Sequence, residues 1–174
     1  KSNLAVYRLA TINEKMREID GEISVLEAKK FLERAKVAFE EVIVKAITSW
    51  HQISRRTLRS EESIQKEKEK YVASKLEAQK AIVTYRDKLE IASNEVNNQS
   101  KALDNLEAKI KDIKSNSSTL IKKDGRDVYL QTLNMLEKQS RPILRRRIEL
   151  NRNLIAVYTS IIEEEKNRSE EHTS

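Results

Sequence analysis

The chain has 174 residues, of which 36% are charged and 38% hydrophobic, with 2 glycines, 1 proline and no cysteine. This composition is typical of long helices with few breaks, and it excludes a disulfide framework and a thiolate metal site. No apolar run reaches the roughly 18 residues of a membrane-spanning helix. The net charge of +6 is spread among interleaved acidic and basic residues, which disfavours nucleic-acid binding.

Aromatic residues make up only 5% of the chain, fewer than a globular core of this size ordinarily carries. We therefore expect an elongated all-α fold in which each helix buries one apolar stripe. Two architectures fit this expectation, a long antiparallel coiled-coil helical hairpin and an elongated three-helix bundle. Either one forms a single helical domain over residues 1–167.

The first helix is predicted over about residues 4–58. It opens with an apolar stripe whose members follow one another in strict steps of three and four residues. Beyond Gly21 the stripe changes phase. Because a glycine costs about 1 kcal/mol relative to alanine inside a helix, we expect a bend or a register shift there. The opening stripe consists of Leu9, Ile12, Met16, Ile19, Ile23 and Leu26.

The second half of this helix is apolar over more than one narrow stripe. Val37, Ile43, Val44 and Ile47 widen the apolar arc. A helix with so wide an arc usually touches two or more neighbours. We predict that these four residues form an oligomer face, covered by a second copy or by other helices of the full-length protein.

The polar stretch after Trp50 has two interpretations. In the first, a new helix starts near Ser60 with Glu61 to Ser63 in its first turn, which gives a three-helix bundle. In the second, which we favour, the first two helices are continuous. No cluster of Gly, Pro or Asn marks a turn, and the heptad phase is kept from Trp50 to Tyr71. The second helix extends over about residues 60–114 in either case.

The rest of the chain predicts an antiparallel hairpin. Heptad seams run along the second helix and along a third helix of about residues 126–166. Residues 115–125 are the predicted loop, from which Leu120 and Ile121 fold back over the end of the seam. The seam residues are Ile82, Tyr85, Leu89, Ala92, Val96, Leu103, Leu106, Ile110 and Ile113, then Leu133, Leu136, Ile143, Leu150, Leu154, Val157 and Ile161.

Two further features belong to the third helix. Pro142 lies inside it and should kink it around residues 138–141, because proline removes one hydrogen bond and clashes with the preceding turn. An arginine cluster surrounds the proline, and we expect its members to pair with glutamates of neighbouring helices. The cluster consists of Arg141, Arg145, Arg146, Arg147 and Arg152.

The two ends of the chain predict a fragment. Residues 168–174, RSEEHTS, resemble a translation of the opening bases of a widely used sequencing adapter. Seven consecutive matches are improbable by chance, so we expect a non-native tail and exclude it from the fold. Because the first residue is Lys1 and not methionine, we also expect the chain to be an internal piece of a longer protein.

The charged residues indicate no catalytic chemistry. Carboxylate pairs such as Glu40 and Glu41 lie in charge-rich runs that are typical of solvated helix faces. His51 stands beside Trp50 with no set of metal ligands around it, which favours a surface position. Phosphate loops and hydrolase motifs are absent from the sequence. We predict a non-enzymatic chain with no catalytic, metal-binding or cofactor-binding residues.

The order of features resembles one helical half of TolC-like outer-membrane efflux and secretion channels. The similarity rests on a long helix that carries Val44, Ala46, Ile47 and Trp50, a second long polar helix, a turn with Gly125 and Arg126, and a returning helix that opens Asp127, Val128, Tyr129 and Leu130. The helical hairpin of the periplasmic adaptor proteins in the same machines is nearly as similar.

This resemblance implies a structural part of a bacterial export conduit, located in the periplasm and associated with the outer membrane. In such channels the helices form an α-barrel by trimerisation, and the turn faces a partner protein. The resemblance thus implies a homo-oligomer and a partner-docking turn, which here comprises Lys122, Lys123, Asp124, Gly125, Arg126 and Asp127.

Two other function classes stay open at this point. A coiled-coil spacer or receptor-binding stalk of a bacteriocin or phage-like protein would use the hairpin itself as its binding surface. A basic coiled coil acting on nucleic acid or anionic lipid is the third class, and the weak positive charge supports it least.

Overall fold

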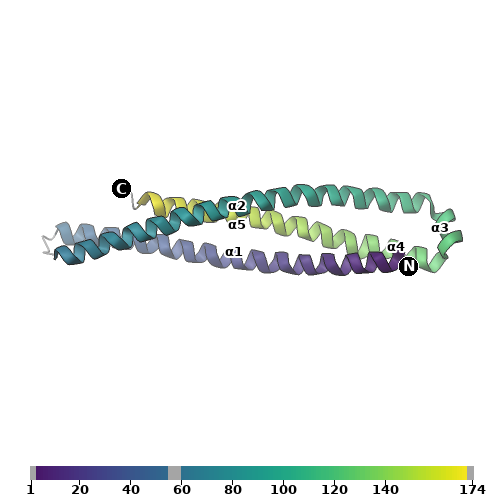
Figure 1. The fold of residues 1–174 in the computed structure, drawn as a ribbon, viewed down its shortest axis with the longest axis horizontal. Helices are drawn as coiled ribbons and strands as arrows, with labels where there is room; N and C mark the ends of the chain where they lie inside the picture. The colour runs from purple at the N-terminus through teal and green to yellow at the C-terminus, as the bar shows by residue number, and fades with distance from the viewer. Residues whose placement is uncertain (1–2, 55–59, 172–174) are drawn as a thin grey trace. The chain divides into compact units, whose positions relative to one another are not determined.

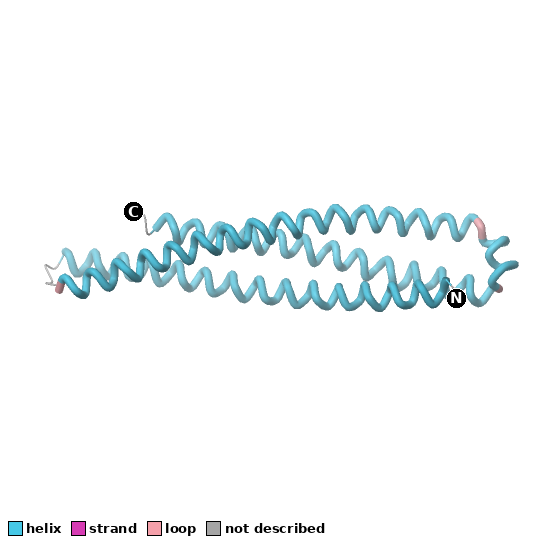
Figure 2. The backbone as a smooth tube through the Cα atoms, viewed as in Figure 1, coloured by secondary structure: helices cyan, strands magenta, loops and turns pink. Residues whose placement is uncertain are grey.

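The computed structural model describes residues 3–54 and 60–171, and all of these except Ser60, Asn116 and Gly125 are helical. No strand occurs among the described residues (Figure 2), so the predicted all-α class is confirmed. The elements in chain order are α1 Asn3–Ser54, α2 Glu61–Ser115, α3 Ser117–Asp124, α4 Arg126–Met135, the π-helical turn η1 Leu136–Ser140, and α5 Arg141–Glu171 (Figure 1).

The contacts divide the chain into two compact units. Unit 1 comprises Lys1–Val25 and Ile91–Leu154, and unit 2 comprises Leu26–Glu90 and Ile155–Ser174. Each unit contains segments of the three long helices α1, α2 and α5. The expected single domain over residues 1–167 stays a prediction, and the two units are described one at a time below.

The core of unit 1 lies where α2 ends and the chain turns back. Ile110 and Ile113 of α2 pack against Leu136 of η1, and all three are buried. Their burial confirms the predicted seam at this end, because heptad positions of two antiparallel helices meet on one side. Partly buried hydrophobic residues close the cluster, among them Leu120, whose predicted return over the seam is confirmed; they are Tyr7, Leu106, Leu120, Tyr129 and Leu133.

The core of unit 2 combines small residues with tyrosines. The Tyr85 ring lies 4.7 Å from that of Phe31 and 5.5 Å from that of Tyr158, measured between ring centroids. Alanines at the inner positions of α1 and α2 leave room for these rings, and Ile161 is completely buried. The buried hydrophobic residues of unit 2 are Ala28, Ala35, Val42, Ala78, Ile82, Tyr85, Tyr158, Ile161 and Ile162.

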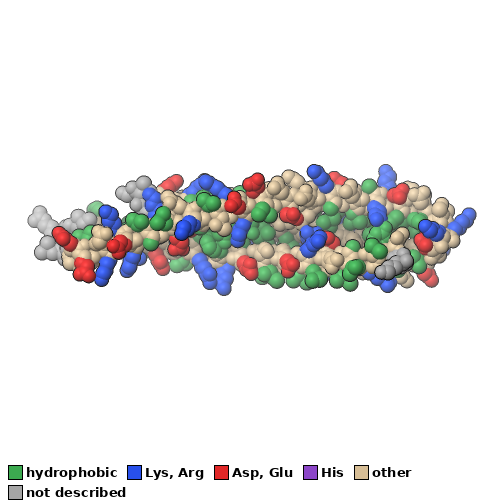
Figure 3. Space-filling view, in the orientation of Figure 1, with side chains coloured by type: hydrophobic (Ala, Val, Ile, Leu, Met, Phe, Trp, Pro, Cys, Tyr) green, Lys and Arg blue, Asp and Glu red, His purple; other side chains and the backbone are tan. Residues whose placement is uncertain are grey.

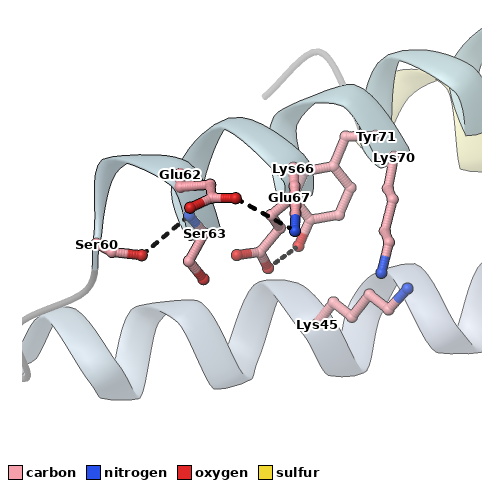
Figure 4. A pocket seen from close by; sticks show the side chains of 8 residues that line it. All are labelled: Lys45, Ser60, Glu62, Ser63, Lys66, Glu67, Lys70 and Tyr71. Atoms are coloured by element: carbon pink, nitrogen blue, oxygen red, sulfur yellow. Dashed lines mark hydrogen bonds and ion pairs between the residues drawn. The ribbon is translucent and has the colours of Figure 1, made fainter.

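The favoured continuity of the first two helices is wrong. Ser60 is not helical, and its Oγ accepts a hydrogen bond of 3.1 Å from the backbone N–H of Ser63 (Figure 4). This is an N-cap, and Glu61 and Glu62 follow it in the first turn, where carboxylates interact favourably with the helix dipole. A local start signal thus outweighs an unbroken heptad count, and the alternative with a new helix after Ser60 is confirmed.

The predicted loop over residues 115–125 is largely wrong as well. Eight of these residues form α3, and only Asn116 and Gly125 interrupt the helices on either side of it. Leu120 packs on the unit 1 core, which stabilises a helix that polar composition alone would not predict. Neither α3 nor α4 begins with a side-chain cap.

Gly21 lies within the uninterrupted helix α1 and faces Leu150 of α5. A Cβ added at Gly21 would lie 3.3 Å from Cδ1 of Leu150. The missing side chain therefore allows close helix packing within unit 1, and the expected bend or register shift stays a prediction.

The proline prediction is correct in its position. The irregular segment η1 ends just before Pro142, and the Arg141 N–H donates to the carbonyl of Leu136, five residues earlier. A wider turn relieves the clash between a proline ring and the carbonyl four residues before it. The strain that we expected to appear as a kink is accommodated as one π-helical turn.

The proposed non-native tail begins in a helix. α5 continues to Glu171, and Arg168 lies buried beside Glu165, with 2.7 Å between its Nη2 and the Oε2 of the carboxylate. Burial raises the pKa of Glu165, and the adjacent Arg168 partly opposes this effect. A helical conformation is compatible with either origin, so the non-native origin of residues 168–174 stays a prediction.

Candidate interaction surfaces

The turn of the hairpin is an exposed charged surface in unit 1. All six residues of the predicted docking turn are exposed, and they cover the end of α3 and the start of α4. Gly125 has a φ of +87°, a conformation that other residues rarely adopt, so it fixes the direction in which α4 leaves. The turn carries three basic and two acidic side chains: Lys122, Lys123 and Arg126, with Asp124 and Asp127.

The predicted oligomer face is exposed in unit 2. Val37, Val44 and Ile47 are 52%, 61% and 52% exposed, and Ile43 is 36% exposed. Their neighbour Val42 is 6% exposed, which shows that the apolar arc of α1 is too wide for the helices that pack against it here. The structure therefore brings the four residues to one open surface, and their oligomeric role stays a prediction.

The longest exposed apolar surface of unit 1 lies on α1, and the sequence had not assigned it a role. We name it the outer stripe; it consists of Leu9, Ile12, Met16, Ile19 and Ile23, which are 61%, 58%, 59%, 46% and 48% exposed. Figure 3 shows hydrophobic side chains gathered over this part of α1. Its strict spacing predicts a helix but does not show which side of that helix is buried.

The opposite side of α1 packs against the rest of unit 1 with polar and small residues. Thr11 and Glu18 are 8% and 6% exposed, and Gly21 faces Leu150. The Thr11 hydroxyl lies 3.0 Å from that of Ser140. Between the buried Leu4 and Val25, the outer stripe thus points outward while polar and small residues point inward, the reverse of the usual arrangement.

Four of the five clustered arginines pair with glutamates of neighbouring helices, as predicted. Arg147 binds Glu14 of α1, and Arg146 lies 3.9 Å from Glu22, also on α1. The carboxylate of Glu107 on α2 lies 3.0 Å from Nε of Arg141 and 3.4 Å from Nη2 of Arg145. These ion pairs connect α5 to α1 and α2 in unit 1. The fifth member, Arg152, is exposed on α5.

A groove of about 400 Å³, lined mainly by apolar surface, lies between the helices of unit 1. The Glu14–Arg147 pair and the Thr11–Ser140 contact also line it, as does Tyr7, whose ring centroid lies 4.5 Å from the ammonium of Lys109. Because Glu14 pairs with Arg147 and the two hydroxyls lie against each other, these groups do not form a nucleophile beside a base.

A second, shallow pocket of about 480 Å³ lies in unit 2, where α1 passes the first turns of α2 (Figure 4). Lys45 of α1 and Lys70 of α2 extend toward each other along its rim. Lys66 lies 3.5 Å from Glu62 on the same helix. The pocket is therefore a solvated charged surface, which suits neither catalysis nor a buried ligand.

The titratable groups with shifted pKa values belong to the cores. Burial raises the pKa of Tyr158, and the nearby Glu27 adds to this effect. Burial likewise raises the pKa of Tyr85, with further contributions from Tyr158 and Glu165. A hydrogen bond from Lys114 lowers the pKa of Glu137. These pKa shifts follow from packing and ion pairing. None of the three groups lies in a cavity beside a nucleophile.

The described part of the chain contains neither a candidate metal site nor a membrane-spanning helix. Within residues 3–54 and 60–171, no three His, Cys, Asp or Glu residues lie close enough to hold a metal ion. None of the described helices is long and apolar enough to cross a membrane. The side chain of His51, which we expected at the surface, lies outside the described residues.

Comparison of the chain with protein-family models, with curated proteins and with solved structures finds no match. The similarity to TolC-like channels therefore rests on the order of sequence features alone. The exposed surfaces of α1 and of the turn are the features of the structure that bear on function.

Proposed function

We propose that this chain is a non-enzymatic helical assembly module whose working surface is the apolar outer side of α1. The observation that carries this proposal is the outer stripe, five large hydrophobic side chains in heptad spacing that the chain itself leaves 46% to 61% exposed. Contiguous exposed apolar patches of this kind mark interaction sites in soluble proteins.

The energetics favour a helical partner. A large aliphatic side chain contributes about 1.5–3 kcal/mol when it moves from full exposure to full burial. Half-exposed residues at steps of three and four supply about half of that each, and they do so along one line that only another helix can follow. The oligomer face of unit 2, with Val37, Ile43, Val44 and Ile47, offers a second surface of the same kind.

The resemblance to TolC-like channels supports a more specific setting, a bacterial export conduit in the periplasm. There, neighbouring protomers would cover the apolar side of α1, and the exposed turn from Lys122 to Asp127 would dock a protein partner. The mixed charge of this turn suits a polar, reversible contact.

A coiled-coil spacer is the second candidate, and a specific observation favours it. The outer stripe keeps strict heptad steps from Leu9 to Ile23, which is the spacing of helix pairs. A spacer needs such pairing but no ring, and the turn would then be the end of a stalk.

Sedimentation of the complete 174-residue chain over a range of concentrations tests the assembly function. We expect self-association, or binding of a hydrophobic dye by the monomer. Ile12→Glu combined with Ile19→Glu should abolish the self-association and the dye binding that depend on the outer stripe. Ile43→Glu combined with Ile47→Glu should abolish those that depend on the oligomer face of unit 2.

The matched control is Ile91→Glu, because Ile91 is 63% exposed but belongs to neither surface. It should change neither association nor dye binding. A monomer that binds no dye and is indifferent to all three changes would contradict the assembly function.

A further inference from the structure

The outer stripe lies on the side of α1 that faces away from the unit 1 core. Its members occupy the first and fourth positions of successive heptads, with Leu9, Met16 and Ile23 in the first and Ile12 and Ile19 in the fourth. Leu4, Thr11, Glu18 and Val25, all 8% exposed or less, recur every seven residues on the other side of the helix. The helices that bury the inner positions therefore cannot reach the stripe.

Unit 1 offers little else that could cover this surface. Outside α1, the exposed large hydrophobic residues among the described part of unit 1 are Ile91 on α2 and Leu130 on α4. Each stands alone, without another exposed large hydrophobic residue three or four positions away. If a second copy covers the stripe through unit 1, the matching surface of that copy is therefore the same stripe.

We propose that the outer stripe pairs with the outer stripe of a second copy as an antiparallel coiled coil, centred between Arg17 and Glu18. The inference rests on the proposed assembly function and names the partner of its main surface. In this register Ile12 faces Ile23 of the second copy, and Met16 faces Ile19. Two-fold symmetry repeats both contacts, and Leu9 meets position 26, which is also a leucine.

The charges beside the stripe favour the antiparallel direction. Lys15 and Glu22 are exposed and precede first-position residues, which places Lys15 opposite Glu22 of the second copy, twice in the dimer. Lys15 lies 3.0 Å from Glu18 in its own helix, and an ammonium has donors for two carboxylates. Asn13 stands opposite Asp20. No like charges therefore meet beside the four central layers, which are the Ile12–Ile23 and Met16–Ile19 contacts and their two-fold copies.

A parallel pair is less favourable. It would place Lys15 opposite Asp20, which is attractive, but it would also place Glu22 opposite Glu27, twice in the dimer. Like charges at these positions destabilise a helix pair and steer it toward another partner or direction.

The proposed pair has a consequence for assembly. A two-fold contact closes on itself as a dimer and cannot form a ring of three or more copies. A conduit would need a second contact between dimers, and the unit 2 face with Val37, Ile43, Val44 and Ile47 is available for it. The dimer would then be the building unit.

Cysteine cross-linking tests the direction, because the chain has no cysteine of its own. A tagged Ile12→Cys chain and an untagged Ile23→Cys chain are oxidised separately and after mixing. We expect disulfide-linked dimers only in the mixture, with one tagged and one untagged chain. Linked dimers within each separate variant would mean a parallel pair and would overturn the inference, while the assembly function would stand.

A charge reversal provides an independent readout. Glu22→Lys places two lysines opposite each other in the antiparallel dimer, so its dissociation constant should rise about three- to ten-fold. The same change should tighten a parallel pair, because the new lysine would then face Glu27. Circular dichroism confirms that each variant is as helical as the parent chain. Lys101→Glu, at an exposed position of α2 outside the stripe, is the control and should leave the dimer unchanged.

The remaining outcomes are also decisive. A chain that sediments as a monomer at high concentration, yet binds dye through the stripe, keeps the assembly function but overturns pairing with a second copy. An oligomer that forms no cross-link in any combination places the contact elsewhere and overturns the inference as well. A monomer without dye binding contradicts both proposals.

Discussion

The two halves of α1 present opposite chemistry to the helices that pack against them. In unit 1 the inner positions between the buried Leu4 and Val25 are polar or small, as Thr11, Glu18 and Gly21 show, and the outer stripe points outward. In unit 2 the inner positions are apolar, with Ala28, Ala35 and Val42 buried. The same helix thus acts in unit 2 as an ordinary core element.

This difference shows where each unit obtains its stability. Unit 2 buries Ala28, Ala35 and Val42 of α1 in its core, whereas unit 1 buries mainly residues of α2, η1 and α5, together with Leu4 and Val25 of α1. Ion pairs such as Glu14–Arg147 also connect α1 to unit 1. Partly exposed ion pairs contribute little compared with buried aliphatic residues. An apolar surface that does not contribute to the folded core is available for association. The outer stripe of unit 1 is longer than the oligomer face of unit 2.

The largest effect should come from the residue that faces Gly21. Leu150 is 3% exposed, so Leu150→Ala should lower the free energy of unfolding by about 2–5 kcal/mol through lost burial and a cavity. Leu9→Ala, the same change on the outer stripe, should cost well under half of that when urea unfolding is measured on dilute, monomeric protein. Equal losses would show that α1 contributes its outward residues to the unit 1 core.

Filling the space at Gly21 should be the next most harmful change. The Cβ of any new residue meets Leu150 at 3.3 Å, so Gly21→Leu should destabilise by about 1–3 kcal/mol despite its better helix propensity. Ala46→Gly, at an exposed position of the same helix, serves as the comparison for propensity alone. A stabilised Gly21→Leu variant in thermal unfolding would mean that α1 and α5 are not in close contact there.

Two valines on α1 sharpen the comparison within unit 2. Val42 is 6% exposed and Val44 is 61% exposed. Val42→Ala should therefore cost about 1–2 kcal/mol, and Val44→Ala should cost less than about 0.5 kcal/mol. Chemical unfolding of both variants measures the difference, and a reversed order would assign the inner face of this half of α1 to the wrong residues.

The smallest effects should appear in the dependence of stability on pH, with opposite signs in the two units. Burial holds the pKa of Tyr158 above its ordinary value of about 10. The stabilisation is complete below the unfolded pKa and is lost as the pH rises through the folded one. Tyr158→Phe should flatten this alkaline loss in unfolding curves recorded between about pH 9 and 12.

In unit 1 the stability should change with pH in the opposite direction. The hydrogen bond from Lys114 lowers the pKa of Glu137, so its contribution is present above the unfolded pKa and is lost as the pH falls through the folded one. Glu137→Gln should remove this acid-sensitive part and leave the alkaline part unchanged. If Tyr158→Phe changed the unfolding free energy only at acid pH, the assignment of the alkaline loss to the buried Tyr158 would be wrong.

Much of the fold could be predicted from the sequence, because periodicity determines where helices form. The seams of α2 and α5, the return of Leu120, the pairing of the arginines and the position of the irregularity before Pro142 all followed from spacing and side-chain chemistry. The start of α2 at Glu61 was misjudged, since a short capping signal at Ser60 looked weaker than a continuous heptad.

The inner face of α1 in unit 1 could not be predicted in the same way. A stripe as regular as Leu9 to Ile23 looks like a core seam, and nothing in a single sequence tells a buried stripe from one kept for a partner. Thr11 and Glu18 gave no signal of burial, because the residues that cover them lie on other helices. For the candidate surfaces, exposure of the turn and of the oligomer face was foreseen, whereas the outer stripe was recognised only from its exposure.

The π-helical turn η1 has a consequence for how the hairpin opens. At Leu136 to Ser140 the ladder of backbone hydrogen bonds changes spacing, and Pro142 supplies no amide to it. Fraying that starts at Gly125 and melts α4 therefore meets a break before it reaches α5. Amide protons of α4 should exchange with solvent as one small cooperative group, while those of α5 stay protected, so that the tip of the hairpin can open and close without loosening the long helix behind it.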